Sequence, residues 1–215
     1  MARTAVTAVV FEADAGELRL SEWLAMAGSG TGVLVLEGVV AIGVHVGDRI
    51  AAELVGAGDL IQPWRGEDEE LLSTEIEWRA LVPVRFALLD PSFAERAASW
   101  PQLSCALVRR AHRRTQRLNV QRAIAAQPRL DARLALLLWH LAARWGRVER
   151  AGIRLPLPLT HQLLGCLIGA ERPSVTHVLA RLSESGVVTG QGDERHIQGN
   201  LDAQLPAMFE PAPSG

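Results

Sequence analysis

The chain has 215 residues, of which 48% are hydrophobic and 21% charged, a composition typical of a soluble globular protein. Its formal net charge is −2, and its two cysteines, Cys105 and Cys166, are too few for a disulfide framework, a cysteine-rich zinc site or an iron–sulfur site with four thiolates. The chain contains no run of about 18 apolar residues, and its first twenty residues include three acids. We therefore expect neither a membrane span nor a secretory signal peptide, and the expected location is the cytoplasm.

The charges are distributed unevenly along the chain. Residues 1–95 contain 6 Arg and 16 Asp or Glu, a net charge of −10, whereas residues 96–215 contain 16 Arg and 8 acids, a net charge of +8. Lys is absent. A composition bias would explain Arg in place of Lys, but it would not separate the signs. The separation predicts two domains with different partners.

Residues 18–90 are predicted to form β-strands. Their candidate segments are rich in β-branched residues and are separated by glycine-containing turns. Strands that recur every 8–12 residues with turns between them are typical of an all-β sandwich or jelly roll. The strand candidates are 33–44, 78–82 and 84–89.

From Pro91 onward the sequence predicts helices. A short helix is expected over 93–100, and a long one over 102–127, with Pro101 at its permitted first position and Pro128 after its end. The long helix has a seam for helix–helix contact at alternating three- and four-residue steps. Arg122 interrupts the seam, which consists of Val108, Ala111, Thr115, Leu118 and Ala125. A buried helix capped by Asp131 is expected over 132–145.

The segment 159–182 predicts a helix-turn-helix. Thr160 is the expected N-cap of its first helix and Gly169 the expected end, while Pro173 suits the first turn of the second helix. The second helix has an expected buried stripe of Val175, Val178, Leu179 and Leu182. A hairpin over 187–197 then predicts a wing. A helical hairpin without a nucleic-acid role would share the apolar spacing, but the cap, tight turn and wing together favour DNA binding.

This order of elements over residues 15–200 resembles the Crp/Fnr family of bacterial transcription regulators. Four segments carry the resemblance: 35–40, 55–61, 159–165 and 178–188. The resemblance implies an α+β fold with an antiparallel, jelly-roll-like β-roll, a long dimerisation helix and a C-terminal winged helix-turn-helix. The expected domains are a sensor-like β-roll at 1–95, the dimerisation helix region at 96–130, the DNA-binding domain at 131–200 and a flexible tail at 201–215.

The resemblance also implies the partners and the binding residues. It implies a homodimer that places two recognition helices in successive major grooves of a palindromic double-stranded DNA operator, with RNA polymerase as a further partner. Arg172 has the planar fork that can bind guanine O6 and N7, whereas Pro173 has no acceptor for a cytosine amine, and Arg181 is expected to contact phosphate. The expected DNA-binding residues are Thr160, Arg172, Pro173, Ser174, Thr176, His177 and Arg181.

The sequence leaves the effector open. Cyclic-nucleotide members of the family close their phosphate pocket with a Gly-Glu turn and an Arg-Ser-Ala sequence. Here Gly58-Asp59 is followed by an acidic stretch at 65–70, interpreted as a solvated loop, and Arg-Ser-Ala is absent. We therefore expect neither cyclic AMP nor cyclic GMP to bind. Isolated His45 and His112 favour neither haem nor metal, so no cofactor is expected.

The residues leave alternatives open at three points: the role of Cys105, the role of the tryptophans and the function of the whole chain. Cys105 beside Arg109 could be a redox sensor, although packing of a small apolar side chain is favoured. Tryptophans of the β domain could line a ligand pocket or, as we favour, fill the core; these are Trp23, Trp64 and Trp78. The whole chain could also be a β-barrel ligand-binding protein or enzyme with a helical oligomerisation tail. The basic second part and Arg172 at a helix start favour a regulator that is not an enzyme.

Overall fold

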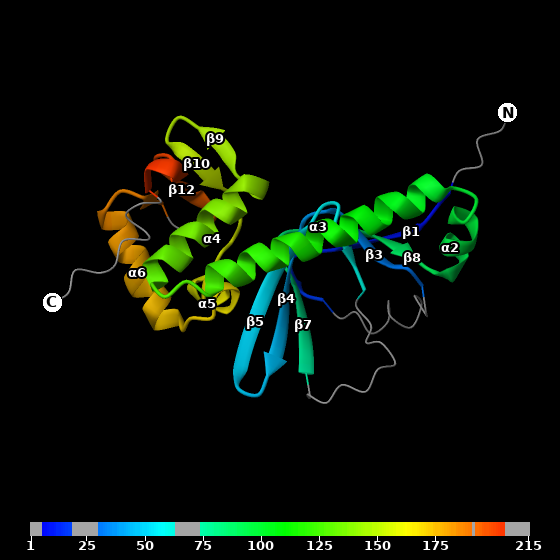
Figure 1. Cartoon of the computed structure of the whole chain (residues 1–215), viewed down its shortest axis with the longest axis horizontal. Helices are drawn as coiled ribbons and strands as arrows, with labels where there is room; N and C mark the ends of the chain where they lie inside the picture. The colour runs from blue at the N-terminus through cyan, green and yellow to red at the C-terminus, as the bar shows by residue number, and fades with distance from the viewer. Residues whose placement is uncertain (1–5, 19–29, 63–73, 191, 205–215) are drawn as a thin grey trace. The chain divides into compact units, whose positions relative to one another are not determined.

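The structure is a computed structural model that describes residues 6–18, 30–62, 74–190 and 192–204. The chain divides into two compact units, residues 1–118 and 119–215 (Figure 1). In the described part of the chain, no helix is long and apolar enough to cross a membrane.

The first unit contains two four-stranded sheets in which every strand pair is antiparallel. One sheet has the order β1-β8-β3-β6, and its strands are Val9–Ala13, Val84–Leu89, Gly32–Glu37 and Leu60–Ile61. The other has the order β2-β7-β4-β5, with strands Gly16–Glu17, Thr74–Ala80, Val39–Val46 and Arg49–Gly56. This arrangement confirms the antiparallel β-roll.

The strand boundaries correct the sequence-based expectation at three places. The predicted strand 33–44 is two strands, because Gly38 has a φ of +86° and a side chain there would collide with the backbone of Pro83. The predicted strand 78–82 is the second half of β7, which ends at Ala80. β1 and β2 precede residue 18, where the sequence predicts no strand. The acidic stretch 65–70 lies outside the described residues, as do Trp23 and Trp64.

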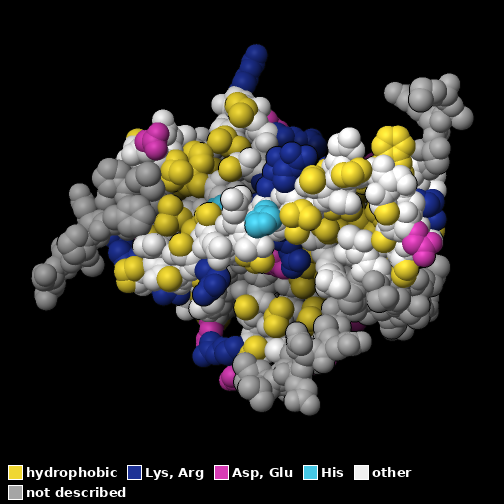
Figure 2. All heavy atoms as spheres, turned by 45° about the vertical axis from the view of Figure 1, so that its right-hand side comes forward, with side chains coloured by type: hydrophobic (Ala, Val, Ile, Leu, Met, Phe, Trp, Pro, Cys, Tyr) yellow, Lys and Arg dark blue, Asp and Glu magenta, His cyan; other side chains and the backbone are white. Residues whose placement is uncertain are grey.

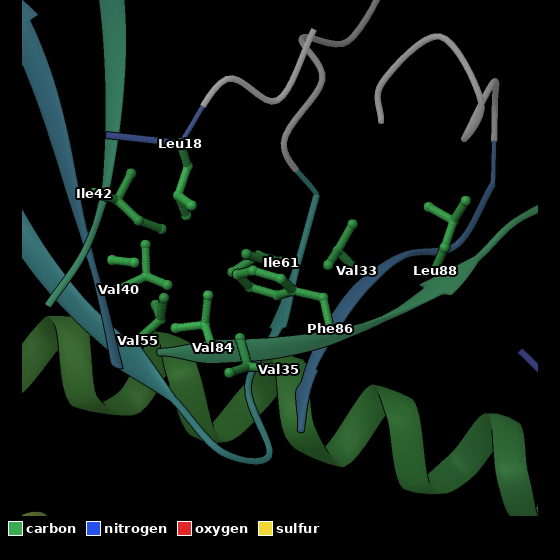
Figure 3. Close-up of a cluster of buried hydrophobic side chains, with 11 residues drawn as sticks. Leu18, Val33, Val35, Val40, Ile42, Val55, Ile61, Val84, Phe86 and Leu88 are labelled. Carbon is green, nitrogen blue, oxygen red and sulfur yellow. The ribbon is translucent and has the colours of Figure 1, made fainter. Parts of the chain in front are cut away.

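The core of the β-roll lies between its two sheets. Figure 3 shows side chains of both sheets pointing toward one another, with the ring of Phe86 among aliphatic side chains. Trp78 is partly buried against this cluster, which agrees with its expected role in the core. The cluster consists of Leu18, Val33, Val35, Val40, Ile42, Val55, Ile61, Ala80, Val84, Phe86 and Leu88. Closing two apolar sheet faces over each other removes these side chains from water.

Two helices follow the β-roll, and both begin at prolines. α2 (Pro91–Ala97) starts two residues before the expected helix, because the carboxylate of Asp90 caps it by accepting a hydrogen bond from the Phe93 amide at 2.7 Å. α3 (Pro101–Ala125) begins at Pro101 as predicted. Leu107 of α3 is buried in a second apolar cluster together with Leu89 and Phe93, so the first part of α3 packs on the β-roll.

Three arginines of α3 bind the β-roll at helical spacing. Arg110 donates to the carbonyl of Gly58 at 3.0 Å, Arg114 pairs with Glu53, and Arg117 pairs with the buried carboxylate of Asp59. The arginines face one side of the helix because residues separated by three or four positions share a helical face. They explain why an Arg-rich helix can pack on an acidic domain.

Beyond the end of α3, the described part of the second unit contains three further helices of eight residues or more and one antiparallel sheet. The helices are α4 (Leu130–Trp145), α5 (His161–Ile168) and α6 (Arg172–Glu184). The sheet order is β11-β12-β10-β9, from Val188–Thr189, Arg195–Ile197, Gly152–Leu155 and Arg147–Glu149, with a 3₁₀ turn at Gly192–Glu194. The predicted wing is therefore half of a four-stranded sheet, because the unexpected β9–β10 hairpin pairs with β12.

The start of α4 also differs from the prediction. Asp131 is not its N-cap: Arg129 occupies that position, and its side chain makes no capping hydrogen bond. Asp131 is the second residue of α4, where its carboxylate accepts from the Ala132 amide at 2.9 Å and pairs with Arg129 at 2.7 Å. A carboxylate in the first turn still favours the helix, because it lies near the positive end of the helix dipole.

Candidate nucleic-acid interface

α5 is bounded by the two residues that the sequence predicts. The Thr160 hydroxyl accepts from the Leu163 amide at 3.1 Å, and Gly169 ends the helix in the left-handed conformation with φ +67° and ψ +42°. Gly165 lies within α5, and the turn that follows α5 folds back against it, so a side chain there would collide with the carbonyl of Ala170. These three positions set the angle at which the chain leaves α5 and enters α6.

α6 packs one face on α4 and α5 and exposes the other. Val175 and Val178 are buried and Leu182 is half-buried, which confirms the predicted stripe. Arg172 and Pro173 are the first two residues of the helix. The outward side chains named from the sequence are exposed: Arg172, Pro173, Ser174, Thr176, His177 and Arg181. A helix of this kind presents its N-terminal half to base edges in known helix-turn-helix proteins.

Two of the outward residues already have partners within the domain. The Thr176 hydroxyl donates to the Arg172 carbonyl at 3.0 Å and contacts Nδ1 of His161 at 2.8 Å. Arg181 lies 3.9 Å from the carboxylate of Asp131 and is 61% exposed, an ion pair of modest strength in water. Arg129, the backbone amide of Ala132 and Arg181 hold the pKa of Asp131 below its usual value, although burial opposes them.

His161 and Arg195 belong to this region, although neither is among the residues expected from the sequence. His161 is the first residue of α5, and burial, together with Arg195 and Arg172, lowers the pKa of its imidazole. Arg195 begins β12 and is only 4% exposed, and burial lowers the pKa of its guanidinium. The position of His161 next to the predicted N-cap Thr160 could have indicated from the sequence that His161 lies in this region. The short wing hairpin, in contrast, gives no indication in the sequence that Arg195 points inward.

The described residues contain no cluster of three or more His, Cys, Asp or Glu placed to hold a metal ion. Cys105 is exposed on α3 and Cys166 is half-buried in α5. His45 lies 3.5 Å from Glu77 across β4 and β7, and His112 is exposed on α3.

Residues 132–200 match the family described as the Crp-like helix-turn-helix domain. This part of the chain is a Crp-like helix-turn-helix domain. The match includes α5, α6, the four-stranded sheet and nearly all of α4. No curated protein sequence matches the chain.

Solved structures of regulators share the fold of the whole chain. FixK2 from Bradyrhizobium japonicum is 18% identical, with 96% of this chain and 99% of that chain covered and a TM-score of 0.66. A CRP-family transcriptional regulator from Thermus thermophilus is 21% identical, with 93% and 96% covered and a TM-score of 0.66. The c-di-GMP responsive regulator CLP from Xanthomonas campestris is 16% identical, with 90% and 95% covered and a TM-score of 0.66.

The Crp-like domain and the shared fold together support a DNA-binding transcription regulator of the Crp/Fnr type. The resemblance and the fold expected from it are thereby confirmed.

Proposed function

We propose that the chain is a sequence-specific transcription regulator that binds a palindromic operator as a homodimer and reads it with α6. The observation that carries the proposal is the exposed N-terminal half of α6 within a Crp-like helix-turn-helix domain. DNA is the partner, so the expected place of action is the cytoplasm, with RNA polymerase as a further partner. Catalysis forms no part of this function.

Arg172 is the residue proposed to read a base. Its guanidinium can donate two parallel hydrogen bonds to O6 and N7 of guanine. The side chain of Pro173 offers no hydrogen-bond acceptor, and the Thr176 hydroxyl is bound to the Arg172 carbonyl and His161. Ser174 and His177 are exposed and available for single contacts. We therefore expect one guanine per half-site as the strongest determinant.

The proposed dimer is formed along α3. Val108 is 57% exposed, Ala111 and Thr115 are exposed, and Leu118 is half-buried. These residues follow the three- and four-residue steps of a helix–helix seam, on a different side of α3 from the arginines that bind the β-roll. Figure 2 shows hydrophobic side chains at the surface beside basic ones on the visible face. A second copy of α3 would cover such residues.

The β-roll is proposed to sense an effector that is not a cyclic nucleotide. Asp59, the acid that follows Gly58, accepts from the Gly56 amide at 2.9 Å and pairs with Arg117, so its carboxylate has a structural role.

The domain division proposed from the sequence has 1–95 as the sensor, 96–130 as the dimerisation region and 131–200 as the DNA-binding domain. In the tail, Gln204 accepts from the Trp139 indole at 3.0 Å, while 205–215 lie outside the described residues.

Replacing Arg172 by Ala tests the proposal. We expect Arg172→Ala to weaken binding to the operator by about 1–3 kcal/mol per half-site and to relax selectivity at the contacted base. Arg181→Ala is the matched comparison, since loss of a phosphate contact weakens binding to all sequences alike and reduces the salt dependence. Fluorescence anisotropy with operator and scrambled duplexes measures both. Equal losses on both duplexes for Arg172→Ala would contradict a reading role.

A further inference from the structure

A cavity of about 560 Å³ lies in the second unit where the start of α5, one side of α6 and the wing meet. Leu159, Leu179 and Val188 give it apolar walls, while His161 and Arg195 are its ionisable lining residues. Hydroxyl groups of Thr160, Thr176 and Ser183 complete the polar lining. This size and this combination of apolar walls with a few polar groups are typical of ligand sites.

Arg195 is the unusual member of this lining. Its side chain is buried, yet among the described residues it makes one long hydrogen bond, from Nη1 to the carbonyl of Leu159 at 3.5 Å. Within the residues that the structure describes, no carboxylate pairs with this guanidinium. Buried charges in proteins are nearly always paired, because removing an ion from water costs several kcal/mol. An anion in the cavity would supply the missing counter-charge.

His161 contributes through the direction of its hydrogen bond. The single O–H of Thr176 donates to the Arg172 carbonyl, so at Nδ1 of His161 the Thr176 oxygen must accept. Nδ1 therefore carries a proton, and in the neutral ring Nε2 is an acceptor. Protonation of the ring converts Nε2 into a second donor, as an anionic ligand requires.

We propose that this cavity is an oxyanion-binding site in which the Arg195 guanidinium, His161 and the start of α5 hold a phosphate, sulfate or carboxylate group. The N-terminus of α5 adds the positive end of a helix dipole, and Thr160 caps it. The cavity has room for more than the anionic group. The anion can come from a small organic molecule or from the DNA backbone, since α6 and the wing border the cavity. The site does not depend on sequence reading by α6.

Binding of an anion should be linked to proton uptake. The charged groups that act on His161 are Arg195 of β12 and Arg172 of α6, and both, together with burial, lower the pKa of the ring. These effects favour the neutral form of His161 in the free protein. An anion stabilises the charged imidazole and raises this pKa, so affinity for a permanently charged anion should increase as the pH falls toward about 5.5.

The test uses the full chain and inorganic sulfate, whose charge does not change between about pH 5.5 and 7.5. NMR of the imidazole follows His161, and calorimetry measures affinity. We expect sulfate to shift the His161 resonances, to raise the pKa of His161, and to bind about tenfold more tightly at about pH 5.5 than at 7.5. Arg195→Gln should weaken binding at least tenfold, whereas Arg150→Gln, at an exposed position on the β9–β10 turn, should leave it unchanged.

Wild-type protein alone can overturn the proposal, so it stays testable even if Arg195→Gln unfolds. Absence of any sulfate effect on His161, or equal affinity in a folded Arg195→Gln variant, contradicts the site.

A second experiment adds duplex DNA to the sulfate-bound protein. Displacement of sulfate assigns the anion to a backbone phosphate, and retention of sulfate on the DNA complex assigns it to a free small molecule. Failure of DNA binding with intact sulfate binding would contradict the proposed function and leave this site supported.

Discussion

Among the individual residues, Asp59 has a carboxylate with a structural role. It is 1% exposed, accepts from the Gly56 amide at 2.9 Å and pairs with Arg117 of α3. The amide of Val35 donates to the backbone carbonyl of Asp59 at 2.9 Å, so the same residue also fixes the turn before β6. Its side chain therefore joins α3 to the β-roll.

Asp59→Asn should lower the free energy of unfolding by about 2 kcal/mol, because it removes the charge that pairs with Arg117 in a largely buried position. Denaturant unfolding followed by circular dichroism measures this change. Glu95→Gln, an exposed acid on α2, is the matched control and should change stability by less than about 0.5 kcal/mol. Equal effects of the two variants would contradict the structural role of Asp59.

Some of these residue positions follow from local spacing in the sequence, and others depend on partners far away in the chain. The exposure of Arg172 and the cap at Thr160 follow from local spacing, so both could be predicted. The partners of Arg110, Arg114 and Arg117 could not, because they lie more than 50 positions away on another element. For the same reason, nothing near Arg195 in the sequence indicates that it faces Leu159.

At the element scale, the turn between α5 and α6 depends on two glycines in different ways. Gly169 has a positive φ and open space where a Cβ would lie, whereas Gly165 lies inside a helix against the Ala170 carbonyl. An alanine at 169 would incur only the left-handed backbone penalty, but one at 165 would force the turn away from α5.

We expect Gly169→Ala to lower the free energy of unfolding by about 1 kcal/mol and Gly165→Ala to lower it by at least about 2 kcal/mol, as overpacking does. Thermal and denaturant unfolding of the two variants provide the comparison. A Gly165→Ala variant as stable as wild type would contradict the close approach of α5 to the turn.

The exposed seam of α3 predicts how a substitution there changes the oligomeric state. Val108→Asp should shift the protein from dimer to monomer, because it places two carboxylates at the proposed helix–helix contact. The side chain of Val108 is already 57% exposed within one chain, so its loss should not unfold the protein. Gln116→Asp, exposed on another side of α3, is the control.

Sedimentation at micromolar concentration measures this shift. Wild-type protein and Gln116→Asp should sediment as dimers. A monomeric wild-type protein, or a dimeric Val108→Asp variant, would contradict the seam.

Element boundaries are predictable where a local signal fixes them. Pro101, Thr160 and Gly169 begin or end helices as the sequence indicates. Asp131 has the chemistry of a cap because acids favour helix starts, but the chain already turns helical one residue earlier. The β9–β10 hairpin leaves no clear sequence signal, since its strands have only three and four residues and acquire their stability from pairing with β12.

At the scale of the whole molecule, the separation of charge along the chain acquires a structural meaning. The acidic residues 1–95 include the β-roll, which binds three arginines of α3, and the Crp-like domain lies in the second unit. The order of elements could be predicted because it rests on four motifs. The effector could not, because nothing in the sequence of the β-roll supplies a recognisable set of ligand contacts.

The proposed function requires that paired copies of α6 read a DNA sequence. Repeated selection of wild-type complexes from a pool of random duplexes, followed by sequencing, tests it most directly. We expect an enriched inverted repeat with half-site centres about one helical turn, or about 10 base pairs, apart and a guanine in each half-site that Arg172→Ala no longer requires. A pool that retains no shared sequence after selection, although the protein binds DNA, would contradict it.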